Sequence, residues 1–304
     1  MRTQRKAWYI KLIIGFIDLE SNIEIAQSLF NKKKYQETID TCKKILDTDS
    51  NSIEIIKLIS KSFLAIGKTK DARLYFDKAL TLKPDDYEVI KDLGNTYQAN
   101  GDISNAKNYY QQAIAINSSY APALTNLGSI ELKTGNKEEA LSLLIKATDS
   151  DPKLAPAWRN LANGYIQLGK NEEAENACRK SIELNPNIFN SHFLLGTILL
   201  EQNRLSEAEK PLRKTIGLKP DFFQAHLSLG VVLQKLGKLQ DAENACRKAI
   251  EIKPDFAIAN LRLGLILESS GKTNEAKEYY QKAFRKDTKK YLSLLTLYQS
   301  LGEF

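Results

Sequence analysis

The chain has 304 residues, of which 42% are hydrophobic and 27% are charged, a balance typical of a folded protein and not of a disordered one. Lysine and arginine outnumber aspartate and glutamate by 44 to 37, but both signs are interspersed along the chain, so no nucleic-acid-binding surface is expected. Three cysteines are too few, and odd in number, for a disulfide scaffold, which favours a reducing, cytoplasmic location.

The first 18 residues resemble a signal peptide in having a basic start and an apolar run. Lys11 interrupts that run, however, and Asp18 and Glu20 follow where small cleavage-site residues are needed. The run is also shorter than the ~20 apolar residues of a membrane span. We expect residues 1–18 to form a helix that caps the first repeat, with attachment of residues 1–17 to a membrane surface as the alternative.

An internal repeat organises the rest of the chain. The stretch ENACRK occurs at 175–180 and again at 243–248, which is 68 residues, or twice 34, further on. A 34-residue period that begins at Leu19 divides the chain into eight units without an insertion. The units are 19–52, 53–86, 87–120, 121–154, 155–188, 189–222, 223–256 and 257–290.

Glycine and proline recur at fixed places of these units. The eighth place holds glycine at 94, 128, 196, 230 and 264, the fifteenth at 67, 101, 135, 169, 237 and 271, and the thirty-second holds proline at 84, 152, 186, 220 and 254. Glycine at the eighth place lets two helices approach closely, and at the fifteenth it predicts a left-handed helix end. Proline predicts the stop of a second helix. Since apolar residues between these marks have helical spacing, each unit is predicted to be a helical hairpin.

This pattern resembles the tetratricopeptide repeat. The fifth unit carries the clearest match, with Trp158, Leu161, Tyr165, Ala174 and Pro186 at the places of the family pattern. The resemblance covers residues 19–290 and implies an all-α, right-handed superhelical solenoid of eight 34-residue helix-turn-helix repeats. Residues 291–304 are predicted to add a C-terminal capping helix.

Residues that could carry chemistry are scarce. His192 and His226 are the chain's two histidines, and no cysteine or carboxylate accompanies them at metal-ligand spacing, so we expect a packing role. Cys42, Cys178 and Cys246 share the twenty-fourth place and are predicted to be small core residues. No enzyme activity, metal or cofactor is expected.

The resemblance implies that the first helices line a concave groove that holds a peptide. The places that face this groove carry amide and cationic donors in units three to five and apolar side chains in units six to eight. The candidate peptide-binding residues are Lys91, Asn95, Asn126, Arg159, Asn160, Asn163, Phe193, Leu227, Val231, Leu261 and Leu265. Polar donors suit an extended backbone, and apolar ones suit apolar anchors. Cover of the apolar strip by the C-terminal helix or by a second copy of the chain, as a homo-oligomer, is the alternative.

A carboxylate clamp of the chaperone-binding kind is not predicted. Lys91, Asn95 and Asn126 match three of its residues, but Pro156 and Asn160 stand where two further cations are needed.

The predicted function is therefore that of a non-catalytic protein-protein interaction scaffold that binds a peptide segment of a partner protein. The alternative is a targeting or substrate-recognition module of a glycosyltransferase-type system whose catalytic domain lies on another chain. Repeats that precede such domains look similar, including the asparagines at 126 and 160.

Overall fold

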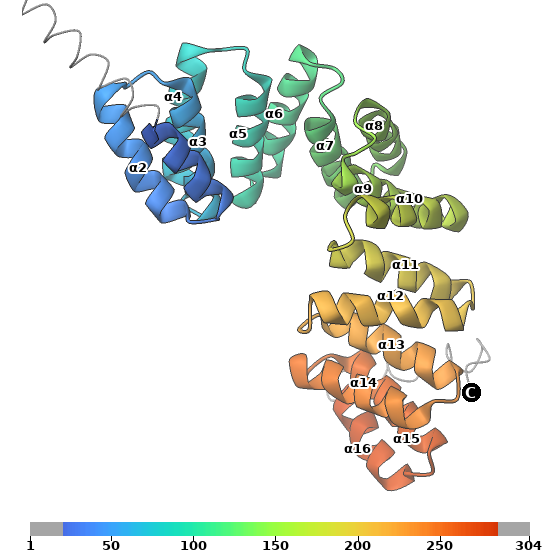
Figure 1. The fold of residues 1–304 in the computed structure, drawn as a ribbon. Coiled ribbons are helices and arrows are strands. Elements are labelled where there is room, and N and C mark those ends of the chain that lie inside the picture. Colours follow the sequence, from blue (N-terminus) through green and yellow to red (C-terminus); the bar gives the residue numbers. More distant parts are fainter. Residues whose placement is uncertain (1–20, 285–304) are drawn as a thin grey trace, which may run out of the picture. The chain divides into compact units, whose positions relative to one another are not determined.

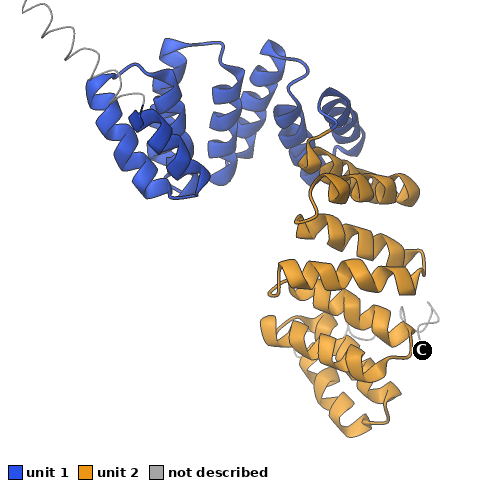
Figure 2. Cartoon of the chain, in the orientation of Figure 1, with its two compact units in different colours: residues 1–152 blue, residues 153–304 orange. Residues whose placement is uncertain are grey.

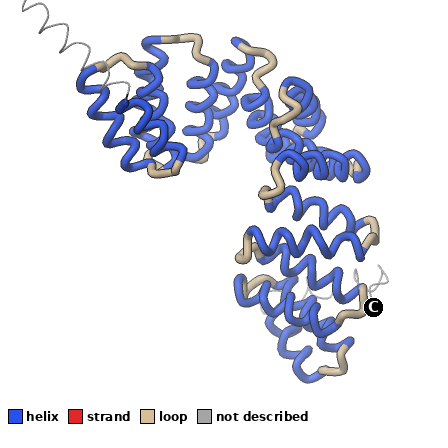
Figure 3. Tube along the Cα trace, in the orientation of Figure 1, coloured by secondary structure: helices blue, strands red, loops and turns tan. Residues whose placement is uncertain are grey.

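The computed structural model describes residues 21–284, which form helices joined by short turns, with no strand in that range (Figures 1 and 3). Residues 21–31 are helical. They are followed by α2 (Tyr35–Thr48), α3 (Ile53–Ala65), α4 (Thr69–Leu82), α5 (Tyr87–Ala99), α6 (Ile103–Ile116), α7 (Ala121–Thr134), α8 (Lys137–Ser150), α9 (Ala155–Gln167), α10 (Asn171–Leu184), α11 (Phe189–Glu201), α12 (Leu205–Leu218), α13 (Phe223–Lys235), α14 (Leu239–Ile252), α15 (Ala257–Ser269) and α16 (Thr273–Phe284). The predicted capping helices at 1–18 and 291–304 lie outside the described residues.

The chain divides into two compact units, residues 1–152 and 153–304 (Figure 2). In the first unit α3 packs against α4, α5 against α6 and α7 against α8. In the second unit the pairs are α9 with α10, α11 with α12, α13 with α14 and α15 with α16. The predicted all-α fold of helical pairs is confirmed, and each pair falls within one 34-residue unit of the sequence.

The turn inside each helical pair has a left-handed residue at the fifteenth place. Glycine occupies it at 67, 101, 135, 169, 237 and 271, with φ between 72° and 93°. Lys33, with φ 60°, and Asn203, with φ 56°, hold the same place where glycine is missing. The fold therefore imposes this conformation on the two residues, although a Cβ atom disfavours it.

We expect Lys33→Gly to raise the free energy of unfolding by about 0.5–1 kcal/mol, because glycine removes the steric cost of the left-handed conformation. Asn203→Gly should raise the free energy of unfolding by less than Lys33→Gly does, since asparagine tolerates the left-handed conformation better than lysine. Urea unfolding of both variants measures the difference. An equal or larger gain for Asn203→Gly would contradict the prediction.

The core of each pair is built on the eighth and twenty-fourth places. A Cβ atom added to Gly94 would lie 2.6 Å from Cε1 of Tyr110, and one added to Gly196 would lie 2.6 Å from Cγ of Leu212. Both partners are fully buried. Glycine at the eighth place thus permits the close helix packing that the sequence predicts.

The three cysteines belong to this core. Cys42, Cys178 and Cys246 are unpaired and fully buried. Burial raises the pKa of each thiol to about 12. Because the thiolate is the reactive form, the cysteines are inert packing residues in the native protein, as predicted.

Candidate functional site

The first helices of successive pairs form one surface of each compact unit. In the second unit α9 contacts α11, α11 contacts α13 and α13 contacts α15, and in the first unit α3 contacts α5. The second helices α10, α12, α14 and α16 make few or no direct contacts with one another. Successive first helices therefore lie closer together than successive second helices, so the stack of repeats in the second unit curves toward its first helices. In each unit we call the exposed side of the first helices the inner surface.

On the inner surface of the first unit, two of the predicted peptide-binding residues, Lys91 and Asn95, donate hydrogen bonds to Asp92. Its carboxylate is almost fully buried, and Oδ1 lies 2.5 Å from Nζ of Lys91 and 3.1 Å from Nδ2 of Asn95. Nζ of Lys61 lies 3.7 Å from the other oxygen. Lys91 is therefore neutralised within the protein, and its charge is only partly available to a ligand.

Asn95 and Asn126 are brought together across α5 and α7. Nδ2 of Asn126 donates to Oδ1 of Asn95 over 2.8 Å. The hydroxyl of Tyr110, from α6, lies 2.8 Å from the same oxygen and 2.6 Å from Oε1 of Gln98. Burial raises the pKa of Tyr110, so the hydroxyl stays protonated and can donate. A buried tyrosine hydroxyl usually has a polar partner nearby, and Tyr110 follows this rule.

Arg159 differs from Lys91. It lies half-buried on α9, and its Nη2 donates to Oδ1 of Asn160 over 2.9 Å. Burial lowers the pKa of the guanidinium, which nonetheless remains charged at neutral pH. Within the described part of the second unit no carboxylate forms an ion pair with Arg159, and the half-buried Asn163 on the same helix forms no side-chain hydrogen bond there.

The apolar candidates divide into two groups. Phe193, Leu227 and Val231 are half-buried, and the ring of Phe193 packs edge-on against Phe222 with centroids 4.9 Å apart. Leu261 and Leu265 are only 3% and 7% exposed. These two leucines therefore offer little surface to a peptide.

The histidines have a structural role. Nε2 of His192 lies 2.9 Å from the carbonyl oxygen of Pro186, and Nε2 of His226 lies 2.9 Å from that of Pro220. Asn260, at the same fourth place, donates from Nδ2 to the carbonyl of Pro254 over 2.9 Å. Since a carbonyl oxygen only accepts, both imidazoles donate. The fourth place thus supplies an N–H group to the end of the preceding repeat, which supports the predicted packing role.

The paired helices, their left-handed turns and their small-residue contacts define a tetratricopeptide-repeat protein. The model of the family described as the cilia and flagella-associated protein 70 C-terminal domain matches residues 86–291. The chain belongs to this family. Tetratricopeptide repeats are typically protein-interaction modules and are generally non-catalytic. None of the described helices is long and apolar enough to cross a membrane.

Solved structures share the fold. PilF of Pseudomonas aeruginosa is 19% identical over 73% of this chain and 98% of its own, with a TM-score of 0.64. The Cut9–Hcn1 hetero-tetramer of the APC/C gives 17% identity over 89% of this chain and 54% of that chain, with a TM-score of 0.66. YrrB, described as a tetratricopeptide protein with an unusual peptide-binding site, is 23% identical over 60% and 95%, with a TM-score of 0.50. No curated protein matches the chain in sequence.

Proposed function

We propose that the chain is a non-catalytic scaffold that binds an extended peptide segment of a partner protein along its inner surface, with Arg159 receiving an acidic group of that segment. The observation that carries the proposal is the half-buried guanidinium of Arg159, which bonds to Asn160 and has no carboxylate partner within the described part of its unit. An unpaired cation that is partly withdrawn from water lowers the stability of the fold, and binding of an anion compensates for this loss.

The neighbours of Arg159 suit a peptide rather than a small anion. Phe193 and Leu227 occupy the same place as Arg159 on the next two first helices, so the three side chains form a row across α9, α11 and α13. Asn163 adds an amide that can both donate to and accept from a peptide backbone. The row and Asn163 together therefore offer one charged, one polar and two apolar contacts to an extended chain.

The family suggests where the partner is found. Membership in a family named for cilia and flagella supports a partner among the proteins of these organelles, a narrower location than the cytoplasm expected from composition. The glycosyltransferase-type alternative rests on the asparagines at 126 and 160, which bond to Asn95 and Arg159.

Replacing Arg159 by methionine tests the proposal. Peptides selected on the wild type from a phage-displayed random library should include a class that binds Arg159→Met at least tenfold more weakly, because a charge-assisted hydrogen bond is lost. The free energy of unfolding should stay unchanged or rise by up to ~1 kcal/mol, since an unpaired charge is removed. Fluorescence anisotropy and urea unfolding provide the two measurements.

Lys146→Met on α8 is the matched control, because it removes an exposed cation from a second helix and should leave peptide binding unchanged. The proposal fails if every selected peptide binds Arg159→Met as well as the wild type. It is also contradicted if Arg159→Met strongly destabilises the fold, which is the behaviour of a cation already paired inside the protein.

A further inference from the structure

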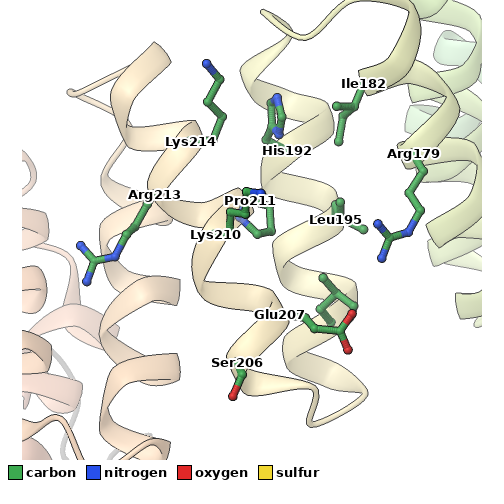
Figure 4. A pocket seen from close by; sticks show the side chains of 11 residues that line it. Arg179, Ile182, His192, Leu195, Ser206, Glu207, Lys210, Pro211, Arg213 and Lys214 are labelled. Atoms are coloured by element: carbon green, nitrogen blue, oxygen red, sulfur yellow. The ribbon is translucent and has the colours of Figure 1, made fainter.

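A cleft of about 900 Å³ opens on the outer side of the second unit, between α10 and α12 (Figure 4). Ile182 from α10, Leu195 and Leu199 from α11 and Pro211 from α12 supply its apolar lining. All of these residues lie within one compact unit, on the second-helix side and therefore away from the inner surface. The volume falls within the range of known ligand pockets, about 300–1,000 Å³.

The cleft lies at two places that carry aromatic rings in other repeats. In the second and third repeats the eleventh and twenty-third places carry stacked pairs, with centroids 5.6 Å apart for Phe63 and Tyr75 and 5.2 Å apart for Tyr97 and Tyr109. In the sixth repeat the same places hold Leu199 and Pro211. The sixth repeat therefore has no ring pair at the cleft.

Pro211 also changes the backbone at the cleft. It lies inside α12 and has no N–H, so the carbonyl of Glu207, four residues earlier, cannot receive its usual helical hydrogen bond. Glu207 itself lines the cleft. A proline in a helix interior lowers stability.

The rim of the cleft is basic. Arg179 and Arg213 line it and pair with Glu175 and Glu209, at 2.6 Å and 2.8 Å. Lys210 and Lys214 line it as well, are exposed, and form no ion pair with any of residues 21–284. The neighbouring acid of the lining, Glu207, is bound by Arg204 over 2.7 Å. The rim therefore retains two uncompensated positive charges above an apolar floor.

We propose that this cleft is a second docking site, which binds an acidic amphipathic segment of a partner protein. Apolar side chains of that segment lie against Ile182, the half-buried member of the apolar lining, and its carboxylates lie against the exposed Lys210 and Lys214. The charge complementarity selects an acidic partner. The apolar floor, without aromatic rings on which bases could stack, fits a peptide better than a nucleic acid.

The probe is a fluorescein-labelled peptide of about 14 residues that has leucine on one helical face and glutamate elsewhere. Fluorescence anisotropy with the full chain should show binding of this peptide, which weakens as salt is added. A peptide with lysine in place of glutamate and one with serine in place of leucine should both bind at least tenfold more weakly.

Two variants of the cleft separate its apolar and charged parts. Leu199→Phe with Pro211→Tyr rebuilds the aromatic pair that the chain uses in its first unit, and should weaken binding at least tenfold while the fold is kept. Lys210→Glu with Lys214→Glu should also weaken binding at least tenfold. Lys78→Glu with Lys146→Glu makes the same charge change on α4 and α8, at the place that Lys214 holds on α12, and should leave binding unchanged.

Several outcomes overturn the proposal. They are equal affinity for the glutamate and lysine peptides, an equal loss in the control variant, and tighter binding of a single-stranded oligonucleotide than of the glutamate peptide. Arg159→Met should not affect the cleft. If it abolished binding of the glutamate peptide, the inner surface would be the site and the cleft would not, so the two proposals can fail separately.

Discussion

Lys107→Met is expected to lower the free energy of unfolding by about 2–3 kcal/mol, because it leaves the buried carboxylate of Glu131 without a cation. Nζ of Lys107 lies 2.7 Å from Oε1 of Glu131, whose side chain is fully buried. Nδ2 of Asn136 donates to Oε2 over 2.7 Å. Lys107 is about one-third exposed, so water moderates the loss to the lower end, or just below, of the range of about 3–5 kcal/mol for a broken buried pair.

The loss should depend on pH in a characteristic way. Burial alone raises the pKa of Glu131, but hydrogen bonds from Lys107 and Asn136 outweigh it and hold the pKa below its usual range. In the wild type this carboxylate therefore stabilises the fold above the unfolded pKa of about 4.3, and the contribution is lost as the pH falls through the lower folded value. Without Lys107, burial should dominate and raise the pKa, so the deficit of the variant should shrink as the pH falls.

Lys107→Met with Glu131→Leu is the control, because leucine holds the same place at 199, 233 and 267. It should recover most of the lost stability, since no buried charge remains. Urea unfolding between pH 4 and pH 8 measures all three proteins. A double variant as unstable as Lys107→Met would show that Lys107 acts through packing and not through Glu131.

Gly196→Ala is expected to lower the free energy of unfolding by about 2 kcal/mol, although alanine is the better helix former. The added Cβ would lie 2.6 Å from Cγ and 2.7 Å from Cδ2 of Leu212, which is fully buried and has little room to move. Gly217→Ala is the matched control on α12. Nothing lies within 4 Å of a Cβ at that position, so the substitution should raise stability by about 0.5–1 kcal/mol.

Leu212→Cys should rescue Gly196→Ala. The chain itself combines alanine at the eighth place with cysteine at the twenty-fourth, in Ala26 with Cys42 and in Ala162 with Cys178. The double variant should be more stable than the sum of the single effects by at least ~1 kcal/mol, as expected for residues in contact. Additive losses in a double-mutant cycle would contradict the inferred steric coupling.

The fold was predictable because its signals are local and repeated. Glycine at the fifteenth place and proline at the thirty-second fix the ends of helices from the chain's own backbone preferences, and the ENACRK copies set the period. The two repeats that lack glycine at the fifteenth place keep the same backbone, since Lys33 and Asn203 adopt the left-handed conformation that glycine adopts elsewhere.

The candidate site was less predictable, because it depends on which neighbours a side chain meets. Lys91 and Arg159 occupy the same place of their repeats, so the sequence alone does not distinguish them. The structure does, because Asp92 forms an ion pair with Lys91, whereas no described carboxylate of the second unit does so with Arg159. The burial of Leu261 depends on what covers it, which spacing along a helix does not specify. The sequence shows a proline, Pro211, within the second helix of the sixth repeat. That proline alone does not predict a cleft, and its position becomes informative only when the structure shows that the equivalent places of another repeat hold a stacked ring pair.

The imidazoles of His192 and His226 and the amide of Asn260 play the same part at three successive repeats, since each donates an N–H group to the carbonyl of the proline six residues earlier. Two chemically different side chains thus make one type of joint. Exchanging histidine and asparagine at the fourth place should therefore keep the connection between neighbouring repeats.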